Sequence, residues 1–187
     1  MSSVRKPPSL TIFFTGLPGA GKSTIANILK ARLEEAGHRN IALLDGDVIR
    51  KTLSKGLGFS RKDRMENIRR AGNAALEITK TGGVCICAMI APYREAREQV
   101  RQLILKEGGF VEVFIDTPLA ECARRDPKGL FAKAHAGALK QMTGIDDPYE
   151  PPETPEVHIQ TLLMAPDESA EKILAYLFKH GNLFNPA

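Results

Sequence analysis

Tryptophan is absent from the sequence, aromatic residues make up only 6% of it, and it contains three cysteines. So few cysteines exclude the dense disulfide framework of small secreted proteins. No apolar run approaches the roughly 18 residues that a membrane span requires, and the opening MSSVRKPPSL lacks the apolar core of a signal peptide. We therefore expect a cytoplasmic protein without a membrane partner, whose cysteines pack in its interior.

Basic residues are in modest excess, with a net charge of +4 and an isoelectric point of about 9.0. The lysines and arginines are spread along the chain, whereas proteins that bind single-stranded nucleic acid cluster them with aromatic residues. We therefore expect no nucleic-acid partner and interpret the charge as suited to small anionic substrates. With 187 residues, 43% of them hydrophobic, the chain is long enough for one compact domain and short for two.

Short apolar runs alternate along the chain with segments of helical periodicity. Strands are predicted at residues 10–15, 41–44, 84–90, 110–115 and 158–164, and helices at 22–36, 62–80, 92–106 and 169–179. This alternation predicts an α/β fold with a mostly parallel sheet and helices on both faces. Residues 1–9 are predicted to be a flexible leader and residues 10–187 a single domain. The polar stretch at 126–155 is longer than most connections and predicts a lid segment or disorder.

The segment between the first predicted strand and the first predicted helix matches the pattern G-x-x-x-x-G-K-[ST]. Glycines let such a loop curl around a phosphate, and the helix N-terminus adds the positive end of a dipole. Lys22 is predicted to reach the β- and γ-phosphates of ATP, and the Ser23 hydroxyl to bind Mg²⁺. The predicted nucleotide-binding residues are Gly16, Leu17, Pro18, Gly19, Ala20, Gly21, Lys22, Ser23 and Thr24. Together with the flanking strand and helix, the motif predicts the three-layer fold of P-loop NTPases.

A second polar group, Asp45-Gly46-Asp47, ends the next predicted strand. Ligands gather at the carboxyl ends of strands in open α/β sheets, so both carboxylates are candidates for binding an acceptor. Arg50 follows about one helical turn later and is a candidate for binding an anion. Alternatively, the aspartates only cap the helix that follows, where Asp is favoured. We assign Lys22 and Asp47 to catalysis, Ser23 and Asp47 to the metal, and both aspartates to the acceptor site.

Five blocks, in order along the chain, resemble the adenylylsulfate kinase family. They are FTGLPGAGKST (residues 14–24), LLDGDVIR (43–50), LGFSRKDRMENIRR (57–70), APYREAR (91–97), and DPKGLFAKAHAG with TGIDDPYEPPETPE (within 126–156). The resemblance implies a kinase that uses ATP with Mg²⁺ to phosphorylate the ribose 3′-hydroxyl of adenosine 5′-phosphosulfate. It also implies a homodimer, and a fusion or association with ATP sulfurylase is compatible with it.

The resemblance implies roles for residues at the acceptor end of the site. Asp47 and Arg50 would meet the acceptor, with Asp47 near the metal and the attacking hydroxyl. Phe59 would stack on the adenine, while Arg64 and Asn67 would hold the phosphosulfate and the ribose. Because Arg64 and Asn67 are three residues apart, they share one face of a predicted helix. Further substrate contacts are assigned to Ile90, Ala91, Lys128 and Met142, and a nucleotide contact to Arg124.

Cations precede Gly129 near the start of the predicted lid. Arg124, Arg125 and Lys128 could neutralise charge on the transferring phosphoryl group once a closed lid excludes water. The alternative is a solvated basic turn.

The chain departs from the usual family pattern at two positions. The family commonly has a serine, associated with phosphorylation, where this chain has Ala91, so a phosphoserine is excluded there. It commonly has an aromatic residue where this chain has Met142, whose sulfur can still pack on a purine. Two other functions therefore stay open. One is a kinase of the same fold with another nucleotide-like acceptor, and the other is a catalytically silent nucleotide-binding module of a sulfurylase–kinase fusion.

Overall fold

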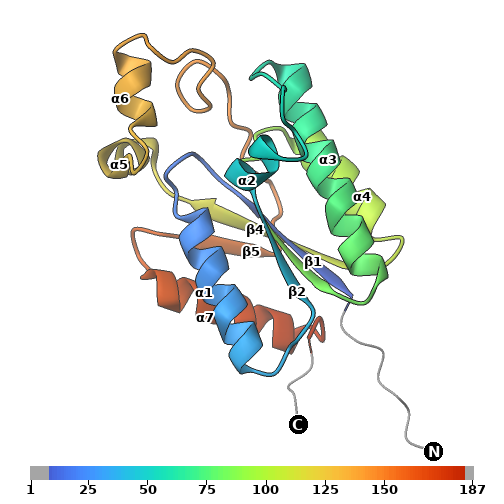
Figure 1. Ribbon diagram of the computed structural model, residues 1–187. Coiled ribbons are helices and arrows are strands. Elements are labelled where there is room, and N and C mark those ends of the chain that lie inside the picture. The colour runs from blue at the N-terminus through green and yellow to red at the C-terminus, as the bar shows by residue number, and fades with distance from the viewer. Residues whose placement is uncertain (1–8, 184–187) are drawn as a thin grey trace, which may run out of the picture.

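The computed structural model describes residues 9–183 of the chain. They form one five-stranded sheet in the order β2-β3-β1-β4-β5, with every strand parallel to its neighbours (Figure 1). The strands are β1 (Leu10–Thr15), β2 (Ile41–Asp45), β3 (Val84–Ala88), β4 (Gly109–Asp116) and β5 (Val157–Gln160). The predicted parallel sheet is thus confirmed. Apart from Ser9, the predicted leader lies outside the described residues.

Helices cover both faces of this sheet (Figure 1). α1 (Lys22–Glu35) and α7 (Pro166–Lys179) pack together on one face, and α3 (Arg61–Lys80) and α4 (Arg94–Ile104) on the other. Three shorter helices follow strands or loops: α2 (Gly46–Lys51), α5 (Leu119–Arg125) and α6 (Leu130–His135). The arrangement confirms the predicted three-layer α/β fold.

The central strand β1 is buried on both faces because alternate side chains of a strand point into opposite layers. Phe14 packs in the core that α1 and α7 cover, whereas Phe13 packs in the core under α3 and α4, with its ring centroid 5.7 Å from that of Phe110. α3 and α4 approach closely at Gly72, where a Cβ atom would lie 2.7 Å from Val100 Cγ2. Both layers therefore fix the strand that leads into the P-loop.

Two strands end earlier than the apolar runs suggested. β3 ends at Ala88 rather than at residue 90, and β5 spans Val157–Gln160 rather than residues 158–164. The chain turns after β5 because the amide of Leu163 donates to the Gln160 carbonyl oxygen at 3.0 Å. Leu162 and Leu163 are exposed there, so the hydrophobic residues of this stretch do not belong to a buried strand.

Helix boundaries also differ from the expectations. α7 starts at Pro166 rather than at residue 169, because proline is well tolerated at the first position of a helix. α5 and α6 were not predicted, and α6 lies within the stretch expected to be a lid or disordered. The carboxylate of Asp126 accepts hydrogen bonds from the amides of Phe131 and Ala132 at 3.1 and 3.0 Å, which stabilises the start of α6. Helices this short offer too few apolar positions for periodicity to reveal them.

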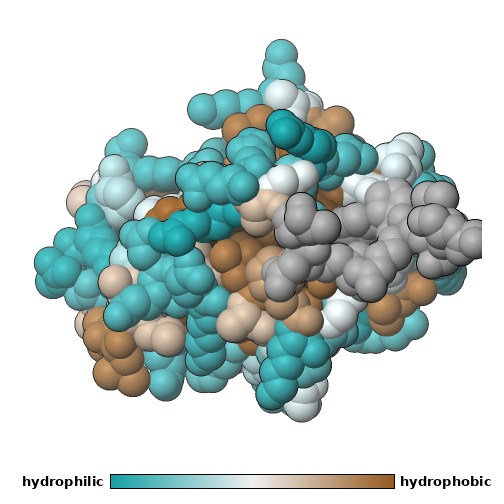
Figure 2. Space-filling view, turned by 90° about the horizontal axis from the view of Figure 1, so that it is seen from below, coloured by the Kyte–Doolittle hydropathy of each residue, from teal (hydrophilic) through white to brown (hydrophobic). Residues whose placement is uncertain are grey.

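The surface seen from below Figure 1 is mostly hydrophilic, with smaller hydrophobic areas between the polar side chains (Figure 2). Among residues 9–183, no helix is long and apolar enough to cross a membrane. Cys85, Cys87 and Cys122 are free and buried, as expected for cysteines that pack in the interior.

Candidate functional site

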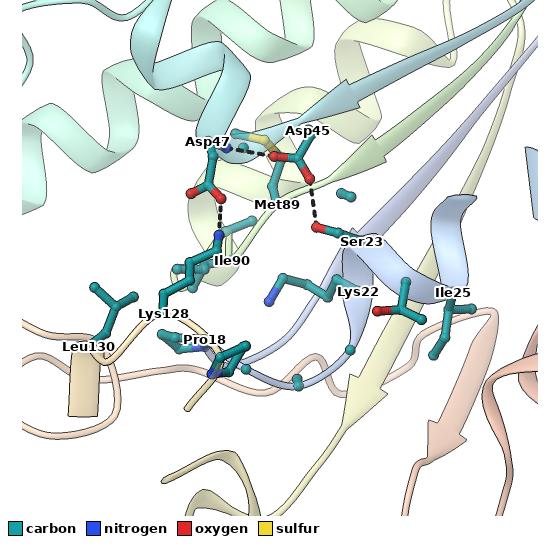
Figure 3. Close-up of a pocket in the computed structure, with 18 of the residues that line it drawn as sticks. Pro18, Lys22, Ser23, Ile25, Asp45, Asp47, Met89, Ile90, Lys128 and Leu130 are labelled. Carbon is teal, nitrogen blue, oxygen red and sulfur yellow. Dashed lines mark hydrogen bonds and ion pairs between the residues drawn. The ribbon is translucent and has the colours of Figure 1, made fainter. Parts of the chain in front are cut away.

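A cavity of about 720 Å³ opens at the carboxyl ends of β1, β2 and β3 (Figure 3). Open α/β sheets bind ligands at this end of their strands. Most of the predicted site residues line the cavity: Pro18, Gly19, Ala20, Gly21, Lys22, Ser23, Thr24, Asp45, Asp47, Arg50, Phe59, Arg64, Asn67, Ile90, Ala91 and Lys128. The structure therefore brings together residues that are widely separated in the sequence.

The P-loop forms one end of this cavity, between β1 and α1. Gly21 has a φ of 103° and directly precedes α1, a left-handed conformation that favours glycine. Gly16 is required for space, since a Cβ atom there would lie 2.5 Å from the carbonyl oxygen of Ile115 in β4. The glycines thus bring the loop against the sheet and directly into the N-terminus of α1, where an anion is favoured.

Lys22 extends from the start of α1 into the P-loop end of the cavity (Figure 3). Its ammonium group donates to the carbonyl oxygens of Gly16 and Leu17 at 2.9 and 2.6 Å, and only 8% of the residue is exposed. Burial lowers the pKa of Lys22 from 10.5 to about 7. A phosphate would supply the missing counter-charge, so this lysine is prepared for an anionic ligand.

A chain of hydrogen bonds joins the P-loop to β2 and α2 (Figure 3). Ser23 Oγ donates to Asp45 Oδ2 at 2.6 Å, and Asp45 Oδ1 accepts from the amide of Asp47 at 2.9 Å. Asp45 is therefore the N-cap of α2, which was the alternative role considered for it, and it also faces the P-loop. The Asp47 carboxylate forms an ion pair with Lys128, which reaches it from the segment before α6.

At the opposite end of the cavity, an aromatic ring lies against two guanidinium groups. The guanidinium carbons of Arg50 and Arg64 are 4.5 and 5.5 Å from the centroid of the Phe59 ring, which is 44% exposed. Burial, followed by the nearby charge of Arg64, lowers the pKa of Arg50. An anion bound here would relieve the repulsion between the two guanidinium groups, and a flat ligand could stack on the ring.

Arg64 and Asn67 are both only 6% exposed and lie on one face of α3, as their spacing predicted. Arg64 Nε donates to the Phe59 carbonyl oxygen at 2.9 Å, and its Nη2 contacts the Gln141 carbonyl and lies 3.2 Å from Asp147 Oδ2. The side-chain oxygen of Asn67 is buried and has no hydrogen-bond partner among residues 9–183. An unpaired buried acceptor is costly, so this oxygen is suited to a donor group on a ligand.

Comparison with known proteins identifies the family of this chain. A family model described as adenylylsulphate kinase matches residues 8–160. The chain belongs to the adenylylsulphate kinase family. The adenylyl-sulfate kinase of Picosynechococcus sp. is 51% identical over 172 residues, which make up 92% of this chain and 95% of that protein. The resemblance inferred from the five sequence blocks is therefore confirmed.

A solved structure and a longer relative agree with this membership. The structure of the Mycobacterium tuberculosis APS kinase CysC in complex with AMPPNP and APS is similar with a TM-score of 0.88 and 41% sequence identity, covering 91% of this chain and 98% of that chain. The bifunctional enzyme NodQ of Azospirillum brasilense is 48% identical over 180 residues, 96% of this chain. The chain spans only 29% of the length of NodQ.

Four residues that the sequence analysis assigned to the site do not line the cavity. The side chain of Arg124 is 74% exposed and pairs with Glu121, whereas its neighbour Arg125 lines the cavity. Met142 is buried in the core and is not part of the lining. Gly16 and Leu17 contribute through their carbonyl oxygens to Lys22 rather than as cavity walls.

Other lining residues were missed by the sequence analysis. Among them are residues of α6, of the turn after β5 and of the start of α7: Leu130, Phe131, Thr161, Met164, Pro166 and Ser169. Leu130 and Phe131 belong to the DPKGLFAKAHAG block but carry no polar side chain, and the other four lie far from the P-loop in sequence, so no local signal pointed to them.

Proposed function

We propose that this adenylylsulphate kinase transfers the γ-phosphoryl group of ATP to the 3′-hydroxyl of adenosine 5′-phosphosulfate. The observation that carries the proposal is one cavity with a P-loop lysine at one end and an aromatic ring beside two arginines at the other. The first end suits a triphosphate, and the second suits a base and an anion. Such a cavity would hold a nucleotide donor and a nucleotide acceptor at the same time.

ATP is proposed to bind with its phosphates over the P-loop. The ammonium group of Lys22 would exchange its two carbonyl partners for phosphate oxygens, and the N-terminus of α1 would add the positive end of its dipole. Arg125 is the lid-side arginine that lines the cavity, so it is better placed than Arg124 to contact the nucleotide. The contact assigned to Arg124 stays a prediction.

The residues at the P-loop fit a magnesium ion. Mg²⁺ prefers oxygen ligands and is commonly held by one or two carboxylates together with substrate phosphates. The hydroxyl of Ser23 and the carboxylates of Asp45 and Asp47 supply such oxygens, and the 2.6 Å contact from Ser23 to Asp45 shows two of them converging. We propose Ser23 and Asp47 as the metal-binding residues. Bound there, the ion would neutralise charge on the transferred phosphoryl group.

The acceptor is proposed to bind at the end formed by α2 and α3. Its adenine would stack on the exposed ring of Phe59, and its phosphosulfate would lie near Arg50 and Arg64. The unpartnered oxygen of Asn67 would accept a hydrogen bond from a ribose hydroxyl or from the base. Ile90 and Ala91 would form the floor between the two substrates.

Phosphoryl transfer depends mainly on positioning and charge neutralisation. We propose that the 3′-hydroxyl oxygen bonds to the γ-phosphorus of ATP while the Asp47 carboxylate accepts the hydroxyl proton. The bond between the γ-phosphorus and the oxygen that bridges it to the β-phosphate breaks at the same time, and ADP is released. Lys128 pairs with Asp47 in this structure and would move to the phosphoryl oxygens when the acceptor displaces it. Ala91 has no hydroxyl, so the transfer is proposed to be direct and in line.

A direct assay tests the proposal. The protein is incubated with ATP and Mg²⁺ and offered adenosine 5′-phosphosulfate, AMP, CMP or shikimate, and each product is weighed by mass spectrometry. Only the phosphosulfate is expected to gain about 80 Da, the mass of one phosphoryl group. A gain on another acceptor alone would keep the kinase and overturn the acceptor, and no acceptor-dependent ATP consumption would favour a silent nucleotide-binding module.

We also propose a homodimer, as the sequence resemblance implied, and a cytoplasmic location, as the sequence predicted from its apolar runs and its opening residues. Light scattering of the purified protein tests the dimer, and cell fractionation tests the location. Association with ATP sulfurylase is a further prediction, which co-purification of the two proteins would test.

A further inference from the structure

Arg97, near the start of α4, is a buried arginine outside the cavity lining and only 3% exposed. Its guanidinium group joins three segments that are distant in sequence. Nε donates to Glu112 Oε1 of β4 at 2.7 Å, Nη1 to the Ala91 carbonyl oxygen at 2.7 Å, and Nη2 to the Glu150 carbonyl oxygen at 2.8 Å. The planar guanidinium group of arginine carries donors on three nitrogen atoms and can reach all three acceptors. The single ammonium nitrogen of lysine cannot.

Ala91 needs such support because its backbone is in an unusual conformation. Its φ is 44°, in the left-handed region that non-glycine residues seldom adopt unless surrounding contacts hold them there. Thr15 Oγ1 donates to the Ile90 carbonyl oxygen at 2.7 Å, and Arg97 binds the next carbonyl, that of Ala91. Ile90 and Ala91 line the cavity, so the two contacts fix the floor of the site from behind.

The second backbone contact of Arg97 fixes the segment that faces Arg64. The amide of Glu150 donates to the Pro92 carbonyl oxygen at 2.8 Å, which holds this segment against the loop that contains Ala91. Three residues earlier, Asp147 lies 3.2 Å from Arg64 Nη2. A shift of residue 150 would therefore reach the arginine at the acceptor end of the cavity.

We propose that Arg97 is a positioning residue for the acceptor, which it does not touch: it holds the backbone of Ala91 and Glu150 in the places from which Ala91 and Arg64 meet that substrate. The inference rests on the proposed acceptor site. Within residues 9–183, the side-chain hydrogen bonds of Arg97 go to Glu112, Ala91 and Glu150 and not to the P-loop. The Gly16 amide donates to the Ile90 carbonyl oxygen at 3.3 Å and not to that of Ala91, so loss of Arg97 should act on the acceptor and leave ATP binding almost unchanged.

Arg101 provides a matched control on the same helix. It lies one turn further along α4 and pairs with the same buried carboxylate, with Nη2 3.3 Å from Glu112 Oε2. Its Nη1 also pairs with Glu156 at 2.5 Å, and within residues 9–183 the guanidinium group forms hydrogen bonds and ion pairs only with side chains, those of Glu98, Glu112 and Glu156. Arg97→Lys and Arg101→Lys therefore disturb the same ion-pair network, but only the first removes the guanidinium contacts to the carbonyl oxygens of Ala91 and Glu150. Thr15 Oγ1, which lies 3.2 Å from the Ala91 carbonyl oxygen, is present in both variants.

The experiment compares wild type, Arg97→Lys and Arg101→Lys by steady-state kinetics and by hydrogen exchange. For Arg97→Lys we expect the KM for adenosine 5′-phosphosulfate to rise about 10-fold or more, on the scale of a small misplacement of binding groups, with the KM for ATP within about 2-fold of wild type. Amides of residues 89–94 and 147–151 should exchange faster in Arg97→Lys than in Arg101→Lys.

Two results would overturn the inference. One is an equal rise in the KM for ATP and the KM for adenosine 5′-phosphosulfate in both variants, in proportion to a lower melting temperature. That result would show a purely structural role. The other is unchanged kinetics and exchange in Arg97→Lys. Failure of the wild type to phosphorylate adenosine 5′-phosphosulfate would refute the proposed function instead, and the exchange comparison does not depend on that activity.

Discussion

The two ends of the cavity are built in different ways. The phosphate end comes mainly from one continuous stretch, residues 18–25, and its key contacts run from Lys22 to the carbonyl oxygens of Gly16 and Leu17 in the same loop. The acceptor end combines residues of α2 and α3 with the loop after β3 and the segment around Gln141. One end is therefore specified locally, whereas the other depends on contacts between distant segments.

This difference predicts which step each substitution should impair. A change at the phosphate end should impair transfer to any acceptor, because every reaction of a P-loop kinase uses the same phosphates. A change at the acceptor end should alter the use of adenosine 5′-phosphosulfate while ATP still binds. Substitutions at the two ends test whether this contrast holds.

The largest effect is expected for Lys22→Met. Loss of the ammonium group should lower kcat/KM by about 1,000-fold, the upper scale for removing one donor to a transition-state charge. Because burial lowers the pKa of Lys22, the variant should melt at the same or a higher temperature than wild type. Lys30→Met, in an exposed pair with Glu34 on the same helix, is the control and should keep full activity. Near-normal turnover in Lys22→Met would refute its assigned role.

Asp47 stands between the two ends, and its replacement separates chemistry from binding. Asp47→Ala should reduce kcat at least about 100-fold, as expected when a group that accepts a proton or holds a metal is lost. The control is Asp45→Asn, because the side-chain oxygen of Asn can still accept from the Asp47 amide as an N-cap while its amide group donates to Ser23 Oγ. It should lose much less activity than Asp47→Ala. Equal losses in single-turnover measurements would mean that the two carboxylates act as one unit.

At the acceptor end, Phe59→Ala should act on one substrate only. Base stacking on an aromatic side chain contributes about 1–3 kcal/mol, so the KM for adenosine 5′-phosphosulfate should rise about 10-fold or more. The KM for ATP should stay near that of wild type, and Phe59→Tyr, which keeps the ring, should retain most of the affinity. If the KM for ATP rose equally, Phe59 would belong to the nucleotide end and the contrast would fail.

The same contrast explains what the sequence predicted and what it did not. The P-loop, the Asp45-Gly46-Asp47 turn and the shared helix face of Arg64 and Asn67 depend on near neighbours, so motif and spacing located them. The ion pair between Asp47 and Lys128 joins residues 81 apart, and the contact of Arg64 with Gln141 joins residues 77 apart. No local pattern encodes such pairs. The orientation of Arg124 away from the cavity likewise depends on which helix face meets the loop.

Strand ends and short helices escaped prediction for a related reason. Leu162 and Leu163 are hydrophobic but exposed, since the chain turns after β5. Apolar character marks burial only where the tertiary structure supplies a partner layer. α6 is six residues long and buries one side chain, Phe131, while Asp126 ahead of it accepts hydrogen bonds from its first turn, so the helix is too short to show a periodicity.

The smallest effect expected is a pH dependence confined to the phosphate end. With a folded-state pKa of about 7, Lys22 is largely neutral in the free protein at pH 8 and must take up a proton when phosphates bind. ATP affinity should therefore fall about fivefold between pH 7 and pH 8, and calorimetry in buffers of different ionisation enthalpy should detect uptake of nearly one proton at pH 8.

The sign of the stability effect follows from the same lowered pKa. Between about pH 7 and 10.5 the unfolded chain holds the Lys22 proton that the folded chain has released, so stability from this group rises with pH while ATP affinity falls. Lys22→Met should abolish both trends. Affinity for the acceptor should stay flat from pH 7 to 8, because Lys22 lies at the other end of the cavity. A parallel fall for both substrates would place the titrating group outside the P-loop and weaken the division between the two ends.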